Sequence, residues 1–151
     1  MNKKIKNAEK NTYDGIVFRS LIEKNAYILL KGEEDFEVAY EQATFILSPG
    51  IVPTVPFWRS TKRSQFRNET RKTLDITYTP DFIVRYNEVL AVVEIKGFPN
   101  DVYPVKRKLF RNLLEHLQEE NPELKYIFFE IKSIRELKKA IQIIRDVSEN
   151  P

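Results

Sequence analysis

The segment YTPDF at residues 78–82 is followed, twelve residues after its phenylalanine, by EIKG at residues 94–97. Apolar β-forming residues lie between the two segments, which places both at or near the ends of strands. Two carboxylates, Asp81 and Glu94, and one ammonium group, Lys96, therefore occur where charges contribute little to solubility. Carboxylate oxygens are the ligands that Mg²⁺ prefers, and a lysine beside them can stabilise developing negative charge. This combination is what metal-dependent cleavage of a phosphodiester requires.

The sequence around these segments predicts regular elements in the order α-β-β-β-α-β-α. The expected elements are a helix over 18–30, strands over 36–47, 75–84 and 89–95, a helix over 104–119, a strand over 126–131 that is apolar enough to be buried, and a helix from a Ser133 capping box to about residue 147. This order predicts an α/β fold with a central mixed sheet flanked by helices. We expect one domain over 13–151, preceded by a basic disordered arm over 1–12.

Glu94 and Lys96 are two residues apart on one expected strand, so both side chains lie on the same face and Ile95 points into the core. The short turn over 85–88 makes this strand an antiparallel neighbour of the strand that carries Asp81. Gly97 and Pro99 then end the strand directly after the lysine. Whether Asp81 faces Glu94 depends on the register between the two strands, which the sequence leaves open.

Two further charged residues are candidates for the same site. Glu23 lies off the polar strip of the first helix and could complete the acidic set, while a salt bridge with Arg19 is the alternative. Lys106 shares the apolar side of the second helix, so its ammonium group could contact a phosphate, or extend to solvent. Gln42 on the first strand could border the cleft.

A basic segment lies between the first two strands. Residues 51–73 form a long flap or loop, and residues 59–72 hold six basic residues against one acidic residue. Beside a phosphodiester site this segment is expected to contact DNA backbone phosphates, with a solvated loop as the alternative. The expected contact residues are Lys62, Arg63, Arg67, Arg71 and Lys72. Trp58, beside Phe57, could stack on a base, but packing of the flap onto the core is the favoured interpretation.

The bulk composition excludes several classes of protein. The chain of 151 residues has no cysteine and a single histidine, His116, which excludes disulfides, thiolate chemistry and multi-histidine zinc sites. No apolar run approaches the length of a membrane span, and no signal-peptide pattern follows the basic N-terminus. We therefore expect a cytoplasmic protein with no membrane partner. The net charge of +3 permits a polyanionic partner without requiring one.

The pair Pro80-Asp81 followed by Glu94-Ile95-Lys96 resembles the name motif of the PD-(D/E)xK nuclease superfamily, and the order α-β-β-β-α-β is similar to its core. Residues 77–82 and 93–97 look like the phage endonuclease I family of Holliday junction resolvases. Residues 13–20 are similar to a family of small phage and prophage endonucleases. The resemblance covers about residues 13–131, and the long segment 51–72 departs from it.

The resemblance implies a restriction-endonuclease-like core and a Mg²⁺-dependent DNA endonuclease, for which Mn²⁺ can substitute. It implies that Asp81, Glu94 and Glu23, with the Ile95 carbonyl, form the metal site and that Lys96 is catalytic. Duplex or branched DNA is the expected partner, and a homodimer is left open. The first alternative hypothesis is a DNA-binding or end-cutting subunit of a recombination complex with little or no activity alone. The others are a DNA-binding module with a vestigial catalytic site and a protein-interaction domain that only shares the fold.

Overall fold

The computed structural model describes residues 11–97 and 100–150. Its elements, in chain order, are β1 (Thr12–Tyr13), β2 (Ile16–Val17), α1 (Leu21–Lys31), β3 (Glu37–Tyr40), β4 (Phe45–Ser48), β5 (Trp58–Ser60), β6 (Phe66–Asn68), β7 (Ile76–Tyr78), β8 (Phe82–Tyr86), β9 (Val89–Ile95), α2 (Tyr103–Glu120), β10 (Lys125–Ile131) and α3 (Ile134–Glu149). The elements α1, β3, β8, β9, α2, β10 and α3 follow the predicted order. Pro99, which was expected to help end the third strand, lies outside the described residues, as do residues 1–10 of the predicted basic arm.

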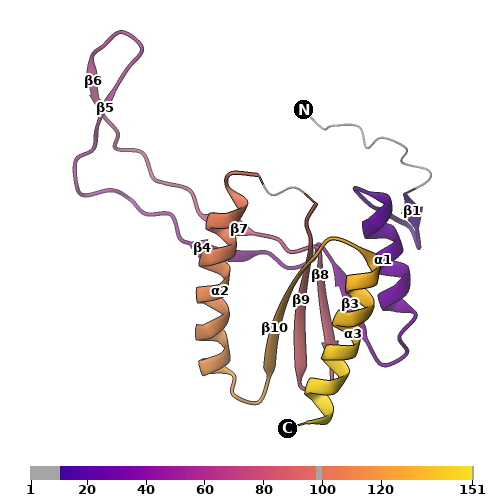
Figure 1. The fold of residues 1–151 in the computed structure, drawn as a ribbon. Coiled ribbons are helices and arrows are strands. Elements are labelled where there is room, and N and C mark those ends of the chain that lie inside the picture. The colour runs from indigo at the N-terminus through magenta and orange to yellow at the C-terminus, as the bar shows by residue number, and fades with distance from the viewer. Residues whose placement is uncertain (1–10, 98–99, 151) are drawn as a thin grey trace.

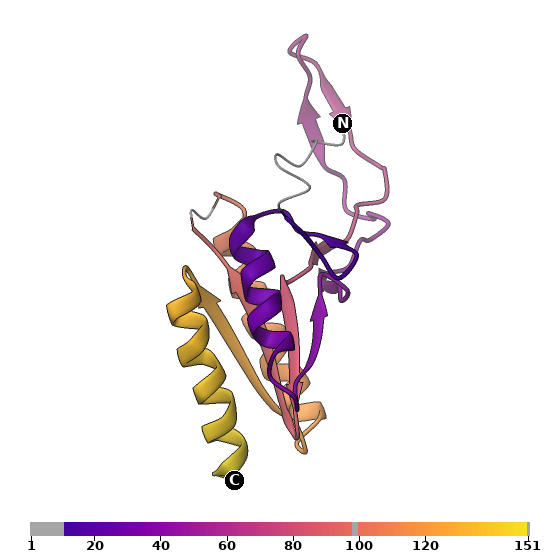
Figure 2. The same ribbon diagram turned by 90° about the vertical axis from the view of Figure 1, so that its right-hand side faces the viewer.

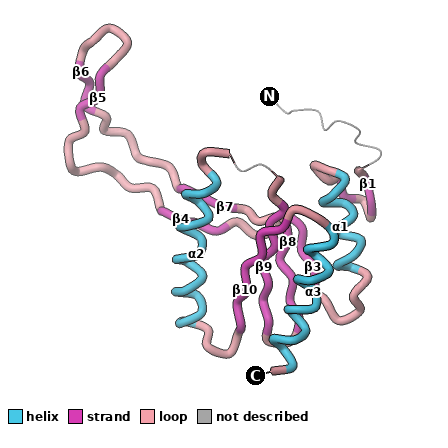
Figure 3. The backbone as a smooth tube through the Cα atoms, in the orientation of Figure 1, coloured by secondary structure: helices cyan, strands magenta, loops and turns pink. Residues whose placement is uncertain are grey.

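The central sheet has four strands in the order β10-β9-β8-β3. Strands β9 and β10 are parallel, with α2 as the connection between them, while β8 pairs antiparallel with β9 and with β3. Helices α1 and α3 cover one face of this sheet, and α2 covers the other (Figures 1 and 3). The predicted α/β class, with a mixed sheet flanked by helices, is confirmed.

An apolar core forms on each face of the sheet. Successive side chains of β9 point to opposite faces, so neighbouring residues of this strand belong to different cores. Val93 belongs to the larger core beneath α1 and α3, where Phe18 and Phe82 are fully buried. Val92 belongs to the smaller core beneath α2, together with Phe110. The alternation places Glu94 on the α2 face of the sheet, and Ile95 packs against the larger core as predicted.

The first helix starts three residues later than predicted. Its N-cap is Ser20, whose hydroxyl oxygen accepts a hydrogen bond from the Glu23 N–H. Phe18, the predicted first residue, precedes the helix and is fully buried against Tyr27 and Tyr40. The apolar character that suggested a helical residue therefore serves tertiary packing instead. At the start of α3 the Ser133 hydroxyl accepts a hydrogen bond from the Glu136 N–H, as the predicted capping box requires, but the Glu136 carboxylate accepts from the Lys132 N–H and not from that of Ser133.

Two predicted strands are each divided in two. The predicted strand over 36–47 is broken at Glu41, which has a left-handed φ of 48°, and its halves β3 and β4 join different sheets. The predicted strand over 75–84 is broken at residues 79–81, where Pro80 has no N–H to donate. Asp81 therefore lies between β7 and β8 and not within a strand. The predicted buried strand at 126–131 is the half-buried edge strand β10.

The segment over 49–74, named the arm from here on, leaves the body of the molecule between β4 and β7. Strands β4 and β7 pair antiparallel at its base, and β5 and β6 form a hairpin toward its end. Figures 1 and 2 show the arm extending well away from the sheet and helices. The predicted flap is therefore a hairpin. Packing of the flap onto the core was the wrong expectation, because the side chain of Trp58 is 60% exposed.

The N-terminal part of the chain differs from the predicted arm in its last residues. Asn11 is buried, and Thr12 pairs with Val17 in the small β1–β2 hairpin. The turn between these strands has Asp14 and Gly15 with positive φ, and Asp14 accepts a hydrogen bond from the Tyr27 hydroxyl. None of the helices in the described ranges has the length and apolar character to cross a lipid bilayer.

Gly50 fixes the base of the arm, and its substitution by alanine is expected to open it. A Cβ at Gly50 would lie 2.1 Å from the carbonyl oxygen of Thr73, which must then move. That movement breaks the pair of hydrogen bonds between Ile51 and Thr73. Gly50→Ala should accelerate amide exchange at Thr73 while the core amides of β9 are unchanged. Gly97→Ala is the matched control, because a Cβ at Gly97 has no atom of the described residues within 4 Å. Equal exchange in both variants would contradict the expectation.

Candidate active site

The register between β8 and β9 brings Asp81 and Glu94 together. Phe82 pairs with Val93 at the end of the ladder, so the next position along both strands sets Asp81 against Glu94. The Ile95 N–H donates a hydrogen bond to Oδ2 of Asp81 at 2.7 Å. Asp81 is 7% exposed and Glu94 is 5% exposed, and they are the only buried carboxylates among the residues that the structure describes. The register that the sequence left open therefore places both at one end of the sheet.

Glu94 is held by a hydroxyl group and an ammonium group on the α2 face. The Tyr78 hydroxyl donates a hydrogen bond to Oε2 at 2.6 Å, and Nζ of Lys96 lies 3.3 Å from Oε1. Nζ of Lys96 also lies 4.2 Å from the centre of the Tyr103 ring, a cation–π contact. Glu94 and Lys96 thus share a face, as period two predicted. The lysine is half-buried between a carboxylate and an aromatic ring, so its position is well defined.

Asp81 lies in surroundings that disfavour its charged form. Burial, and then the negative charge of Glu94, raise its pKa to about 7 from an ordinary value of 3.8. The hydrogen bond from the Ile95 N–H acts in the opposite direction, and the charges of Glu23 and Glu41 raise the pKa further. Two carboxylates this close need a cation or a proton to relieve their repulsion.

Glu23 and Glu41 extend the acidic cluster beyond the buried pair. The Tyr40 hydroxyl donates a hydrogen bond to Oε2 of Glu23 at 2.7 Å, which orients the carboxylate. Arg19 pairs with Glu41 at 3.0 Å, so the alternative salt bridge between Arg19 and Glu23 is not the one formed. Burial raises the pKa of Glu41, the positive charge of Arg19 lowers it, and the charges of Glu23 and Glu94 raise it.

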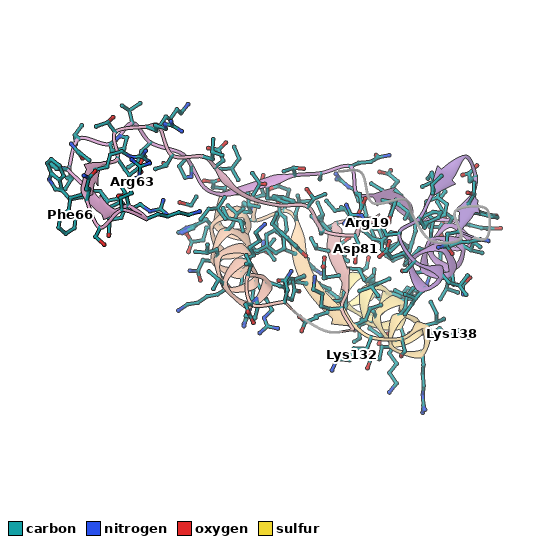
Figure 4. The ribbon with its side chains drawn as sticks, turned by 90° about the horizontal axis from the view of Figure 1, so that it is seen from above. Arg19, Arg63, Phe66, Asp81, Lys132 and Lys138 are labelled. Carbon is teal, nitrogen blue, oxygen red and sulfur yellow. The ribbon has the colours of Figure 1, made fainter. Side chains whose placement is uncertain are left out.

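One cleft collects the candidate residues of the body of the molecule. The residues that were predicted to act at the site and that line it are Glu23, Asp81, Glu94, Ile95, Lys96 and Lys106. Its wall also includes Arg19, whose position near Asp81 can be followed in Figure 4. Gln42 is exposed and is not among the lining residues, so it does not border the cleft as expected. His116 is exposed on α2 and does not line the cleft.

The carboxylate oxygens of the cleft fit a divalent cation that keeps water molecules as some of its ligands. Among the described residues no group of three or more histidine, cysteine, aspartate or glutamate side chains is close enough to enclose a metal. Mg²⁺ does not need such a cage, because it usually binds through one or two carboxylates, waters and substrate phosphates. Asp81 and Glu94 supply two hard oxygen donors, and their mutual repulsion is the condition that a cation relieves.

The predicted contact residues of the arm are not part of this cleft. Lys62, Arg63, Arg67, Arg71 and Lys72 are all exposed on the arm, where Figure 4 shows Arg63 far from Asp81. Arg67 pairs with Glu69 at 2.5 Å. The structure therefore separates the candidate residues into a cleft on the body and a basic surface on the arm.

Three tyrosines and one ion pair of the site were missed by the sequence analysis. Tyr78 and Tyr103 hold Glu94 and Lys96, Tyr40 holds Glu23, and Arg19 with Glu41 completes the rim. For Tyr78 a signal was available, because it lies two residues before Pro80 in the YTPDF segment. For Tyr103 and Tyr40 none was available, since their roles depend on how α2 and β3 pack on the sheet.

Comparison with family models shows that residues 3–127 match the family described as protein of unknown function (DUF1064). The match covers most of the chain, which therefore belongs to this family. Comparison with curated proteins and with solved structures gave no significant match.

The raised pKa of Asp81 predicts an unusual pH dependence of stability for the metal-free protein. An acid whose pKa is higher in the folded than in the unfolded state binds more protons when folded, so its contribution falls as pH rises from about 4 to about 7. A difference of roughly three pKa units corresponds to at most about 4 kcal/mol. Asp81→Asn should therefore raise the melting temperature at pH 8 in chelator, and this gain should shrink toward pH 5.

Thermal unfolding from pH 5 to pH 8 measures this effect. Glu119→Gln, on the exposed side of α2, removes one negative charge without touching the buried pair and should leave the pH dependence unchanged. A melting temperature for Asp81→Asn at or below that of the wild type at pH 8 would contradict the expected repulsion.

Proposed function

We propose that this chain is a Mg²⁺-dependent DNA endonuclease of the PD-(D/E)xK type. The observation that carries the proposal is the cleft that brings together the only buried carboxylates of the described residues, Asp81 and Glu94, and Lys96, which pairs with Glu94. Burying a close pair of carboxylates is costly to a fold and is typical of functional sites. The sheet order and its helices on both faces are compatible with a restriction-endonuclease-like core.

In this proposal Asp81 and Glu94 bind the metal, with the Ile95 carbonyl as a third oxygen donor. Glu23, oriented by Tyr40, acts on the water around it. A bound Mg²⁺ supplies charge neutralisation of the scissile phosphate and lowers the pKa of water for attack on phosphorus. The Tyr78 hydroxyl keeps one oxygen of Glu94 in place, which leaves the other for the metal or for Lys96.

Lys96 has the position required for electrostatic catalysis. Its ammonium group is held between Glu94 and the ring of Tyr103 and has further protons to donate. It orients the attacking water and donates hydrogen bonds to the phosphate oxygens, on which negative charge increases in the transition state. Lys106, on the other wall of the same cleft, contacts a neighbouring backbone phosphate. The basic residues of the arm contact the DNA backbone beyond the cleft.

Cleavage of supercoiled plasmid and of a synthetic four-way junction tests the proposal. Wild-type protein should cut with Mg²⁺ or Mn²⁺ and not with chelator. Lys96→Ala should lower the rate by about 100-fold or more, the size of effect expected for loss of one preorganised hydrogen-bond donor to the transition state. Lys138→Ala is the matched control, because Lys138 is an exposed lysine on α3 that Figure 4 shows directed away from Asp81.

The two carboxylate variants separate catalysis from folding. Asp81→Asn and Glu94→Gln should abolish metal-dependent cutting while DNA binding persists, and Asp81→Asn should do so although it stabilises the metal-free protein. Preference for the junction over linear duplex would identify a resolvase. Pure wild-type protein that binds DNA without cutting it would overturn the stand-alone nuclease and favour a subunit of a recombination complex.

A further inference from the structure

The arm carries aromatic side chains that the fold leaves in solvent. Trp58 is 60% exposed and Phe66 is 74% exposed, both in the β5–β6 hairpin, and Phe57 beside them is 61% exposed. Figure 4 shows Phe66 at the outer end of the arm, with the arm lying between it and the body. Large rings held away from a core by a defined hairpin are typical of interaction surfaces.

The pairing of β5 with β6 divides these side chains between two faces. Trp58 pairs with Asn68 and Ser60 pairs with Phe66, so the two aromatic rings lie on one face with small polar neighbours. Arg59 pairs with Arg67 on the opposite face. The hairpin therefore has an aromatic face and a cationic face.

The strand register also sets how far apart Trp58 and Phe66 lie along the hairpin. Trp58 and Phe66 are diagonal neighbours across the ladder, a relation that separates residues by about 7–8 Å. This is about twice the spacing of roughly 3.4 Å between successive bases in a nucleic-acid strand. None of the ring contacts among the described residues involves Trp58 or Phe66, so neither ring is stacked on another aromatic ring of these residues.

The surrounding charge selects the kind of planar ligand. Residues 59–72 hold six basic residues and one acidic residue, Glu69, which is paired with Arg67. Exposed aromatic rings among cations match single-stranded nucleic acid, in which bases stack on the rings and phosphates contact the cations. Duplex DNA offers the phosphates but keeps its bases stacked on one another. A second copy of the chain would bring two arms of like charge together, which disfavours it as the occupant.

We propose that Trp58 and Phe66 stack on unpaired bases, so that the substrate carries an unpaired segment of DNA at a distance from the bond that is cut. This inference rests on the proposed endonuclease function and names its substrate class. The arm holds the unpaired strand while the cleft receives the phosphodiester. Forked or gapped DNA, or branched DNA with a single-stranded arm, has this combination, and uniform linear duplex does not.

Intrinsic fluorescence tests the proposal directly, because Trp58 is the single tryptophan of the chain. Wild-type protein is titrated in chelator, where no cleavage occurs, with oligo-dT and with a linear duplex of equal length. Stacking on Trp58 should quench its emission saturably with oligo-dT, while the duplex should bind without quenching. Binding of both DNAs is followed in parallel by the anisotropy of a labelled strand.

Variants on the two faces of the hairpin provide the matched comparison. Phe66→Ala should weaken binding of oligo-dT about tenfold, within the range expected for loss of one base–aromatic stack, and leave duplex binding unchanged. Phe57→Ala removes an exposed ring from the face that carries Arg59 and should leave both affinities near those of the wild type. Arg59→Ala should weaken the binding of oligo-dT and of duplex to the same extent and should reduce the salt dependence of both affinities.

The outcomes separate this inference from the proposed function. Binding of oligo-dT without quenching of Trp58, or equal effects of Phe66→Ala and Phe57→Ala, would overturn base stacking even if plasmid is cut. Quenching by oligo-dT with no metal-dependent cutting would support the stacking surface and overturn the nuclease. A concentration-dependent blue shift of Trp58 emission without DNA would show that a second copy covers this face, and would overturn the proposal.

Discussion

The antiparallel register of β8 and β9 is the constraint on which the rest of the site depends. A turn at residues 87–88, with Asn87 in a left-handed conformation, fixes which residues pair along both strands. Because side chains alternate with period two, a slip by one residue would send Glu94 and Lys96 into the core beneath α1 and α3. Phe82, Val84 and Val93 are fully buried in that core and hold the register. Packing on one face of the sheet therefore specifies the chemistry on the other.

The stability of the core offsets the cost of two close buried carboxylates. Without a cation, placing Asp81 against Glu94 does not stabilise the fold, because the two negative charges repel each other. This repulsion, together with burial, raises the pKa of Asp81 to about 7. The Tyr78 hydroxyl, the Ile95 N–H and Lys96 satisfy the two groups in part. Each contact also fixes the direction of an oxygen or nitrogen atom. The groups that partly satisfy the two carboxylates are thus the groups that, under the proposed function, would organise the cluster in advance for a metal and a phosphate.

The sequence predicted the order of the core elements and the shared face of Glu94 and Lys96, because both follow from local periodicity. It did not predict the breaks at Glu41 and at residues 79–81, since long β-forming runs look continuous until a strand changes partner. The expected packing of Trp58 on the core also failed. A hydrophobic ring is ordinarily evidence of burial, but a hairpin projecting from the body provides no core to receive it. Register and long-range packing decided these points, and neither is encoded in a short window.

The arm is a second surface, separate from the cleft, and its aromatic side chains are exposed. The arm is anchored at its base, where Gly50 and Ile51 bond to Asp75 and Thr73, so the hairpin has a defined origin beside the α2 face of the sheet. Most of the surface of its outer residues Trp58 and Phe66 stays exposed, so folding alone recovers only part of the free energy that burial of these residues would contribute. Contact with a partner that covers the rings would supply this missing burial. A hairpin with rings on one face and arginines on the other recovers most from a partner that offers planar rings and negative charge together, and a single DNA strand offers both.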